Sequence, residues 1–454
     1  MKRAVFVLFF VFSLLTSAMA TPALKGTFIQ SWLAASYSAA QWNAEFDSMQ
    51  AVGMDTLIVQ TTMDEVTNQN PPSYSPTTKW TMYPSSISGT TYRGNAPGTS
   101  ISPIELILQT AEARGIKVYI GLNWYDSAWF YRPSSPGVPF IQDSYWCGLE
   151  AARGNTMASE MYSAYKASYP NAFYGWYWPW EVDNADFGNS YAKNALISMM
   201  NANCNYLKSL DSSMPILVSP FYNNALGTAS SYKQFWISVL GQLTNYGAGD
   251  IFAPQDGVGA GHSTVGQVTT WYTNLANAVA TKTGLQMWSN TENFQDAFSG
   301  GGYVPADVKR VANQFNNAAP YVSNFLTFSY SHYSSPQVVN PAFQDSWVNY
   351  AVNGTVSTAT PTKPGTITAT GQVNGKIVLS WVTNPSANGD TGFRIWRNDV
   401  LIGQIEIPNA QRSANAPISF TDPSTSANGA HNVYKIDAFD VNGNISAKKQ
   451  VTGP

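Results

Sequence analysis

The segment FYGWYWPWE, residues 173–181, is an almost uninterrupted run of large apolar side chains that ends on a glutamate. A strand buried on both faces shows this pattern, whereas a strand with one solvated face alternates apolar and polar residues. Strands buried on both faces are typical of a parallel sheet covered by helices. The terminal acid is unusual in a chain with 11% charged residues, against about a quarter in an average domain. This segment therefore indicates a parallel sheet covered by helices, with a candidate functional residue at the end of one strand.

Seven further segments are also rich in consecutive apolar residues, and helical patterns lie between them. One helical pattern begins with Ser102 at the N-cap and Pro103 in the first turn, and Gly115 ends it. Eight strand–helix repeats predict an α/β fold, a (β/α)8 TIM barrel, over residues 21–353. An open doubly wound sheet is the alternative, but no glycine-rich phosphate-binding turn follows the first strand. The predicted strands are 25–32, 54–62, 116–124, 173–181, 215–223, 250–257, 285–294 and 324–333.

Residues 1–20 have the pattern of a secretory signal peptide. A basic start precedes an apolar run at 4–15, and small residues at 18–20 form a cleavage site. No cysteine follows that site, so we expect no lipid anchor. No later apolar run is long enough to cross a bilayer, so we expect no membrane insertion after cleavage. The mature protein is therefore predicted to be periplasmic or secreted, from a bacterial source.

The composition narrows the class of partner. A net charge of −3 and a pI of about 5.6 provide no basic field for nucleic acid. Aromatic residues make up 14% of the chain, which favours a neutral polymer with apolar faces such as a polysaccharide, although large cores also contain aromatics. Cys147 and Cys204 are the two cysteines, and an oxidising compartment leaves a disulfide between them open. With so few cysteines and histidines we expect no Cys/His metal site. We also expect no cofactor and a monomer.

Polar residues occupy the carboxyl ends of the predicted strands, where TIM barrels carry their active sites. The acids there are Glu181 on strand four, Asp256 on strand six and Glu292 on strand seven. Other side chains at these ends are of types that bind sugars by hydrogen bonds or by stacking. They are Trp32, Gln60, Asn123, Trp124, Trp178, Trp180, Tyr222, Asn223, Trp288, Asn290, Tyr330 and His332.

Two glutamates facing each other across a barrel mouth can cleave a glycosidic bond. One carboxylic acid protonates the leaving oxygen while one carboxylate attacks the anomeric carbon, and their carboxyl groups lie about 5–5.5 Å apart. We expect Trp178 and Trp180 to desolvate Glu181 and raise its pKa. We expect polar groups of Asn290, Thr291 and Asn293 to support an ionised Glu292. Asp256 is open between capping a turn and acting in the site; a wider pair containing Asp256 suits an inverting mechanism.

Four motifs carry a resemblance to known enzymes: GTFIQSW (26–32), GWYWPWEVDN (175–184), PQDGVG (254–259) and WSNTENF (288–294). With them, residues 25–352 resemble the clan of retaining (β/α)8 glycoside hydrolases and, more narrowly, a bacterial barrel family described only as glycosyl hydrolase-like. The resemblance implies that Glu181 is the acid/base and Glu292 the nucleophile. The clan has Asn before its acid/base, where it holds the substrate 2-hydroxyl; this chain has Trp180. Asn123 and Asn290 are candidates to replace that contact.

The texture of the sequence changes after Gly354. Residues 354–364 are a Thr/Pro linker, and 365–454 contain short strands separated by turn residues. This last part resembles a fibronectin type III module, with Trp381 in the second strand and Tyr434 near the end. The resemblance implies a small all-β sandwich of the kind used as a spacer in secreted carbohydrate-active enzymes.

Two functions follow from these features. The first is an endo-acting glycoside hydrolase on a neutral or weakly charged polysaccharide, since the long connections 61–100 and 125–145 carry aromatic residues suited to an open cleft. The second is a non-catalytic carbohydrate-binding or matrix protein on a decayed barrel. Glutamates that converge on one pocket favour the enzyme, and glutamates that point apart favour the binding protein.

Overall fold

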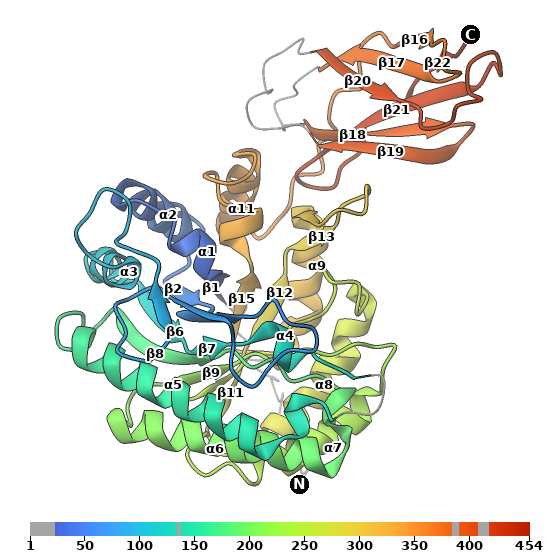
Figure 1. Cartoon of the computed structure of the whole chain (residues 1–454). Helices are drawn as coiled ribbons and strands as arrows, with labels where there is room; N and C mark the ends of the chain where they lie inside the picture. Colours follow the sequence, from blue (N-terminus) through green and yellow to red (C-terminus); the bar gives the residue numbers. More distant parts are fainter. Residues whose placement is uncertain (1–22, 134–137, 384–389, 407–416) are drawn as a thin grey trace, which may run out of the picture.

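The computed structural model describes residues 23–133, 138–383, 390–406 and 417–454 (Figure 1). The predicted signal peptide, residues 1–20, lies outside the described residues. The chain forms a large α/β barrel followed by a small all-β unit, in the order expected from the sequence. Within the described residues, no helix combines the length and the apolar character that a membrane span requires.

The barrel sheet is parallel, and its neighbours follow the order β11-β10-β9-β8-β6-β2-β1-β15-β12. β11 and β12 are two parts of the seventh strand, separated by Trp288, whose amide donates to Phe252 of β10 (3.0 Å). Since β11 pairs with β10 and β12 pairs with β15, the described sheet closes on itself with eight strand positions. The strands are β1 (Ala23–Ile29), β2 (Thr56–Val59), β6 (Lys117–Gly121), β8 (Phe173–Trp178), β9 (Ile216–Val218), β10 (Ile251–Phe252), β11 (Gln286–Met287), β12 (Ser289–Glu292) and β15 (Asn324–Phe328).

Alternate side chains of each strand enter two separate cores, which explains the continuous apolar runs. One core fills the barrel interior and includes Phe28, Tyr119, Tyr177, Leu217 and Trp288. The other lies between the sheet and the helices. Glycine is required where strands approach the interior rings: a Cβ on Gly175 would lie 2.5 Å from the Tyr119 ring. From Gly175 to the end of β8, odd residues therefore face the interior and even residues face the helices; the register is irregular before Gly175, and Phe173 belongs to the helix-side core.

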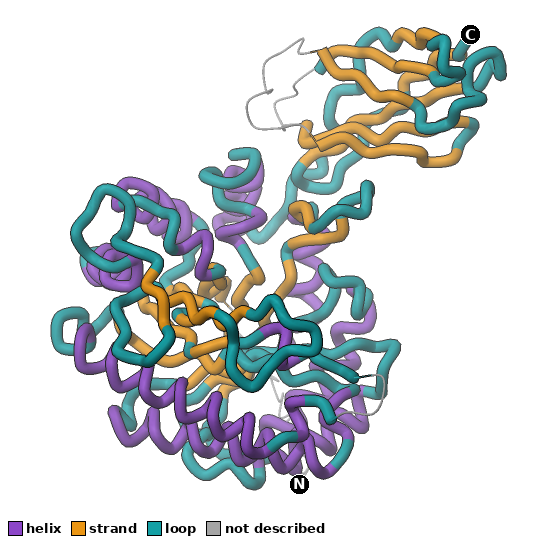
Figure 2. The backbone as a smooth tube through the Cα atoms, viewed as in Figure 1, coloured by secondary structure: helices purple, strands orange, loops and turns teal. Residues whose placement is uncertain are grey.

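A ring of helices covers the outside of the barrel (Figure 2). Ser102 caps its helix by accepting from the Glu105 amide (3.1 Å), as predicted. The helices are α2 (Ala39–Ala51), α3 (Pro103–Glu112), α5 (Ser144–Tyr165), α6 (Ser190–Leu210), α7 (Ala229–Leu240), α8 (Val268–Val279), α9 (Val308–Ala318) and α11 (Ala342–Asn353). Cys147 and Cys204 lie on α5 and α6, which pack together, and both are buried free thiols.

Several predicted strand ends turn out to be helical. The predicted strand 25–32 ends at Ile29 and continues as α1 (Ser31–Ala34), and the predicted strand 324–333 ends at Phe328 and continues as α10 (Tyr330–Tyr333). The connection after β2 forms β3 (Met63–Val66), β4 (Thr78–Thr81) and β5 (Thr90–Tyr92), which join β7 (Asn123–Trp124) in a small sheet beside the strand ends. α4 (Asp126–Trp129) follows β7, and the hairpin β13 (Phe294–Asp296) and β14 (Tyr303–Pro305) follows β12.

The C-terminal unit is all-β, as predicted. Its two antiparallel sheets have the orders β16-β17-β20 and β19-β18-β21-β22. Trp381 and Tyr434 both belong to its core, and the Tyr434 hydroxyl donates to Asp422 (2.6 Å). Its assignment to the fibronectin type III class stays a prediction. The strands are β16 (Thr368–Gly371), β17 (Ile377–Val382), β18 (Asp390–Arg397), β19 (Val400–Glu406), β20 (Pro417–Thr421), β21 (Val433–Asp440) and β22 (Lys449–Thr452).

Candidate functional site

Glu181 lies three residues beyond β8, on the same side of the chain as Tyr177, which faces the barrel interior. Its carbonyl accepts from the Trp129 indole (2.6 Å), and its Oε1 accepts from Nε2 of Gln255 (3.0 Å). Burial raises the pKa of Glu181 to about 7, with smaller contributions from the negative charges of Asp126 and Asp183. The Gln255 amide opposes this rise because it favours the ionised form. At neutrality Glu181 is therefore partly protonated, unlike an ordinary exposed glutamate.

Glu292 is the last residue of β12 and is only 3% exposed. Its Oε2 accepts from the Ala260 amide (2.8 Å), in the connection that follows β10. That connection lies so close that a Cβ on Gly259 would sit 2.9 Å from the Glu292 Cβ. Burial raises the pKa of Glu292 to about 8, and the charge of Asp256 adds to the rise. The amides of Ala260 and Gly259 and the Arg310 guanidinium act in the opposite direction.

The side chains expected to keep Glu292 ionised are bonded elsewhere. The side-chain amide of Asn290 donates to the Ser219 hydroxyl (3.0 Å), and the side-chain amide of Asn293 donates to the Ser334 hydroxyl (2.9 Å). The Thr291 hydroxyl pairs with Ser289 (2.8 Å). The expectation that these three groups support the carboxylate is therefore wrong, and the main-chain amides of Gly259 and Ala260 take that role.

Asp256 combines the two roles that the sequence left open. Its Oδ1 accepts from the amides of Val258 (3.2 Å) and Glu292 (3.3 Å), which is a turn cap and a contact to the candidate site at once. Its Oδ2 accepts from Nε2 of Gln314 on α9 (2.7 Å). Burial raises the pKa of Asp256 to about 6. The hydrogen bonds that Asp256 accepts favour its ionised form more than those of Glu292 do. Asp256 therefore ionises first, and Glu292 keeps the proton.

Gln255 is a site residue that the sequence reasoning missed. It bonds to Glu181, and its main chain forms a parallel bridge with Asn290 on the seventh strand. The next residue, Asp256, accepts from the Glu292 amide. The two candidate glutamates are therefore each bonded to one of two consecutive residues at the end of β10. Its place in the sequence could have identified it, because Gln255 lies two residues beyond Ala253, which faces the barrel interior.

The prediction that Trp178 and Trp180 are sugar platforms is wrong. Both have even numbers on the β8 segment and face the helices, and both are at most 1% exposed. The Trp178 indole donates to Asn203 on α6 (3.1 Å). Trp180 packs against Trp124, Trp129 and Trp146 with ring centroids 5.1–5.8 Å apart. They form an aromatic layer behind the strand end.

Three more predicted sugar contacts are buried in packing positions, which corrects the prediction. Trp288 is 6% exposed, belongs to the interior core and donates to Gln286 (3.1 Å). Tyr222 is fully buried and stacks on Trp271 at 4.3 Å, on the helix side of the sheet. Tyr330 is 1% exposed, and its hydroxyl donates to Gln344 on α11. Tyr222 faces the helices, Trp288 points inward but lies between β11 and β12, before the strand end, and Tyr330 lies in α10, beyond its strand.

Asn123 also lies away from the position predicted for it. Its amide donates to Glu65 (2.9 Å) and Glu150 (2.8 Å), and Arg153 pairs with both of these buried carboxylates at 2.5 Å. The third strand is interrupted after Gly121, between β6 and β7, which redirects this side chain. Both amide hydrogens of Asn123 are thus occupied. Asn290 is the other candidate for the 2-hydroxyl contact, and the Oδ1 atoms of both asparagines are buried without a partner among the described residues.

The other predicted residues lie near the strand ends. Each has a partly exposed side chain or contacts a residue that has one. Trp32 is 56% exposed, and its ring centroid lies 5.2 Å from that of His332. His332 is 7% exposed and accepts from the Gln30 amide (3.1 Å); burial lowers its pKa to about 4, so it is neutral. Gln60, Trp124 and Asn223 are half-buried.

Asp64 is a second residue that the sequence reasoning missed. It lies on β3 and accepts from Arg93 (2.8 Å), Thr61 (2.5 Å) and Ser31. Ser31 and Thr61 lie two residues beyond the ends of β1 and β2, so Asp64 lies beside the strand ends although it belongs to a long connection. No group of three or more metal-ligating side chains occurs among the residues that the structure describes.

Solved structures resemble this barrel at low sequence identity. A protein from Bacteroides thetaiotaomicron, provisionally described as an alpha-L-fucosidase, superimposes with a TM-score of 0.57 at 19% identity, covering 73% of this chain and 94% of that protein. A chitinase from Bacillus thuringiensis (TM-score 0.42, 11% identity, 96% and 85% covered) and a beta-xylosidase from Caulobacter crescentus (0.42, 12%, 83% and 83%) also match. At these identities the likeness concerns the fold, and only the first match is near enough to support it.

Sequence comparison assigns the chain to one protein family. No protein of the curated collection matches it. Residues 24–340 match the family described as "Domain of unknown function (DUF4434)". This match runs from β1 through β15 and covers well over half of the chain. The chain therefore belongs to the DUF4434 family.

Proposed function

We propose that the protein is a secreted glycoside hydrolase that cleaves a polysaccharide with retention of anomeric configuration. One observation carries the proposal. The Glu181 carboxyl group and the Glu292 main-chain amide, at the ends of strands four and seven, are bonded to Gln255 and Asp256, two consecutive residues beyond β10, and burial raises the pKa of both carboxyl groups. Strongly perturbed acids gathered at the carboxyl ends of barrel strands are typical of catalytic sites and are not needed by a binding protein.

In the proposed reaction, the neutral Glu181 gives its proton to the glycosidic oxygen as the bond to the anomeric carbon breaks. The Glu292 carboxylate attacks that carbon from the opposite face and forms a glycosyl ester. The Glu181 carboxylate then takes a proton from water, and the resulting hydroxide displaces Glu292. The enzyme returns to its starting protonation state, and two inversions give net retention.

Protonation decides how much of the enzyme is ready to react. With Glu181 near 7 and Glu292 near 8, the pair carries one proton in the interval between these values. The productive form has the proton on Glu181. A difference of about one pKa unit leaves roughly a tenth of the singly protonated enzyme in that form. We therefore propose a pH–rate profile with its maximum between about 7 and about 8.

Asp256→Asn is expected to shift this profile to lower pH. Removing the Asp256 charge lowers the pKa of Glu292, so Glu292 ionises before Glu181 and the productive form becomes the major one. The alkaline limb of kcat/KM against pH should move down first, the acid limb should follow once Glu292 titrates below Glu181, and the maximum should rise by up to about tenfold. Asp183→Asn is the matched control: it lowers the pKa of Glu181, the lower of the two values, so it should move the acid limb down, leave the alkaline limb in place and lower the maximum. An alkaline limb and a maximum both unchanged by Asp256→Asn contradict the assigned cause.

The proposal extends to substrate and location. The low charge, the aromatic content and the signal-like N-terminus support export and a neutral or weakly charged polysaccharide cut internally. The sugar would meet side chains at the strand ends from several strands. These are Trp32, Gln60, Trp124, Asn223, Gln255, Asn290 and His332.

A panel of polysaccharides tests the function. Mature protein is incubated with each glycan, product sizes are followed over time, and the anomer formed first is read by proton NMR. Early oligomers of the same anomeric configuration as the substrate support the proposal, and the Glu292→Gln variant run in parallel excludes a contaminating activity. Inverted products would assign an inverting mechanism. Binding to a glycan without release of products would favour a non-catalytic carbohydrate-binding protein.

A further inference from the structure

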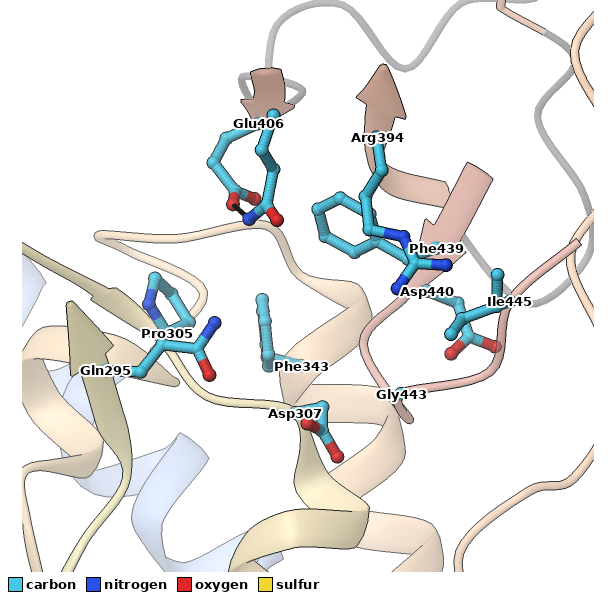
Figure 3. Close-up of a pocket in the computed structure, with 11 residues that line it drawn as sticks. Gln295, Pro305, Asp307, Phe343, Arg394, Glu406, Phe439, Asp440, Gly443 and Ile445 are labelled. Carbon is cyan, nitrogen blue, oxygen red and sulfur yellow. Dashed lines mark hydrogen bonds between the residues drawn. The ribbon is translucent and has the colours of Figure 1, made fainter. Parts of the chain in front are cut away.

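The C-terminal sandwich is joined to the barrel by more than its linker. A short turn after β21, residues 440–445, contacts the first turn of α9 and the side of α11 (Figure 3). We call these residues the docking turn. Val441 within it is 1% exposed and belongs to the large core of the barrel, not to the core of the sandwich. A residue of one unit that is buried in the core of the other indicates a fixed junction.

The docking turn supplies a hydrogen-bond partner to the start of α9. The amide of Val308, the first residue of that helix, donates to the carbonyl of Val441 (2.8 Å). The first amides of a helix have no partner within the helix, so an external acceptor fixes where the helix begins. On α11, the Ser346 hydroxyl donates to the side chain of Asn442 in the docking turn. The side-chain amide of Asn444 donates to the carbonyl of Ser357, which follows α11 (2.8 Å).

Gly443 allows this close approach. Its φ is +77°, and a Cβ there would lie 2.5 Å from Oδ1 and 2.7 Å from Cγ of Asp307. Asp307 is the N-cap of α9 and accepts from the Arg310 amide (2.8 Å). A side chain at Gly443 would therefore force Asp307 to give up its cap or would push the docking turn away.

The same helix holds the candidate nucleophile from behind. Arg310 donates to the carbonyls of Glu292 (3.0 Å) and Phe294 (2.5 Å). Gln314 donates to the Glu292 carbonyl (3.1 Å) and to Asp256 (2.7 Å). Arg310 also opposes the rise in the pKa of both Asp256 and Glu292. One helix thus contacts the sandwich at Val308 and the candidate site at Arg310 in the same turn and at Gln314 nearly two turns later.

We propose that the sandwich is a positioning element of the candidate site: the docking turn fixes α9, and α9 fixes the main chain of Glu292 and the side chain of Asp256. The statement about Glu292 as nucleophile rests on the proposed function, whereas the mechanical link does not. A spacer module would leave α9 unchanged when its junction is disturbed. A positioning element would transmit the disturbance to residues 289–294.

Hydrogen exchange of the full mature chain, followed by mass spectrometry, tests the link. Gly443→Ala should make peptides covering 308–318 and 289–294 exchange at least about tenfold faster. Gly375→Ala is the matched control, because Gly375 also has a positive φ (+78°) and its Cβ would meet Thr425 within the sandwich. It should speed exchange in the sandwich alone. If Gly443→Ala does not fold, Asn444→Ala replaces it as a milder change to the docking turn.

The proposal is overturned if peptides 308–318 and 289–294 exchange as in the wild type in Gly443→Ala, or if Gly375→Ala affects them equally. The pH–rate profile gives a second readout. Displacing Arg310 should raise the pKa of Glu292, which moves the alkaline limb to higher pH and lowers the maximum in Gly443→Ala and not in Gly375→Ala. Exchange is measured without substrate, so a wild-type protein inactive on every glycan would refute the proposed function and leave this test readable.

Discussion

Glu292→Gln is expected to lower kcat by at least about 10⁴-fold, since an amide cannot form the glycosyl ester. The change keeps the shape of the side chain, and the amide oxygen can still accept from the Ala260 amide (2.8 Å). It also removes a buried carboxyl group beside Asp256, whose charge raises the pKa of Glu292. The melting temperature should therefore be equal to or above that of the wild type. Steady-state rates on the glycan found by the panel, together with thermal unfolding, measure both effects.

The paired control for this variant is Glu105→Gln, which makes the same chemical change in the first turn of α3. It should retain the wild-type rate. Turnover of Glu292→Gln within tenfold of the wild type, on preparations shown to be folded, would remove Glu292 from the mechanism. Asp256 would then be the acid to test next, because it is the other buried carboxyl group bonded to this strand end.

Glu181→Ala is expected to have an effect that depends on the leaving group. For a natural glycan, whose leaving oxygen needs a proton, the rate should fall by about 10²–10⁴-fold. For an aryl glycoside of the same sugar with a strongly acidic phenol, bond cleavage needs no proton and glycosylation should stay near the wild-type rate. The second step then lacks its base, so the glycosyl-enzyme should accumulate and give a burst of phenol.

Added azide gives this variant a specific signature. As an anionic nucleophile that needs no base, azide should restore turnover of the aryl glycoside and give a glycosyl azide with retained configuration. Gln255→Ala is the companion variant, because it removes the hydrogen bond to Glu181 (3.0 Å) and leaves the acid in place. It should shift the pH profile and give no azide product. Equal losses of Glu181→Ala on both kinds of substrate, with no azide product, would exclude Glu181 as the acid/base.

The side chains that the sequence misplaced show where local pattern stops being informative. Trp178, Trp180 and Tyr222 were identified at the correct strand ends, yet they face the helices. A strand buried on both faces presents apolar residues to two cores, so its sequence cannot say which core a given ring enters. Asn123 was misplaced for a related reason, because the break between β6 and β7 redirects it toward Glu65 and Glu150.

The sequence by itself determined the order of strands and helices, the cap at Ser102, the all-β tail, and the location of Glu181 and Glu292 at the ends of strands four and seven. These features depend on the periodicity of burial and on local hydrogen bonds, which neighbouring residues specify. Only the tertiary structure decided that Gln255 and Asp256 connect to the two glutamates, that Glu292 rather than Asp256 retains a proton, and that the docking turn caps α9. Each of these depends on contacts between segments tens to more than a hundred residues apart, whose distances and desolvation are set by how the barrel closes.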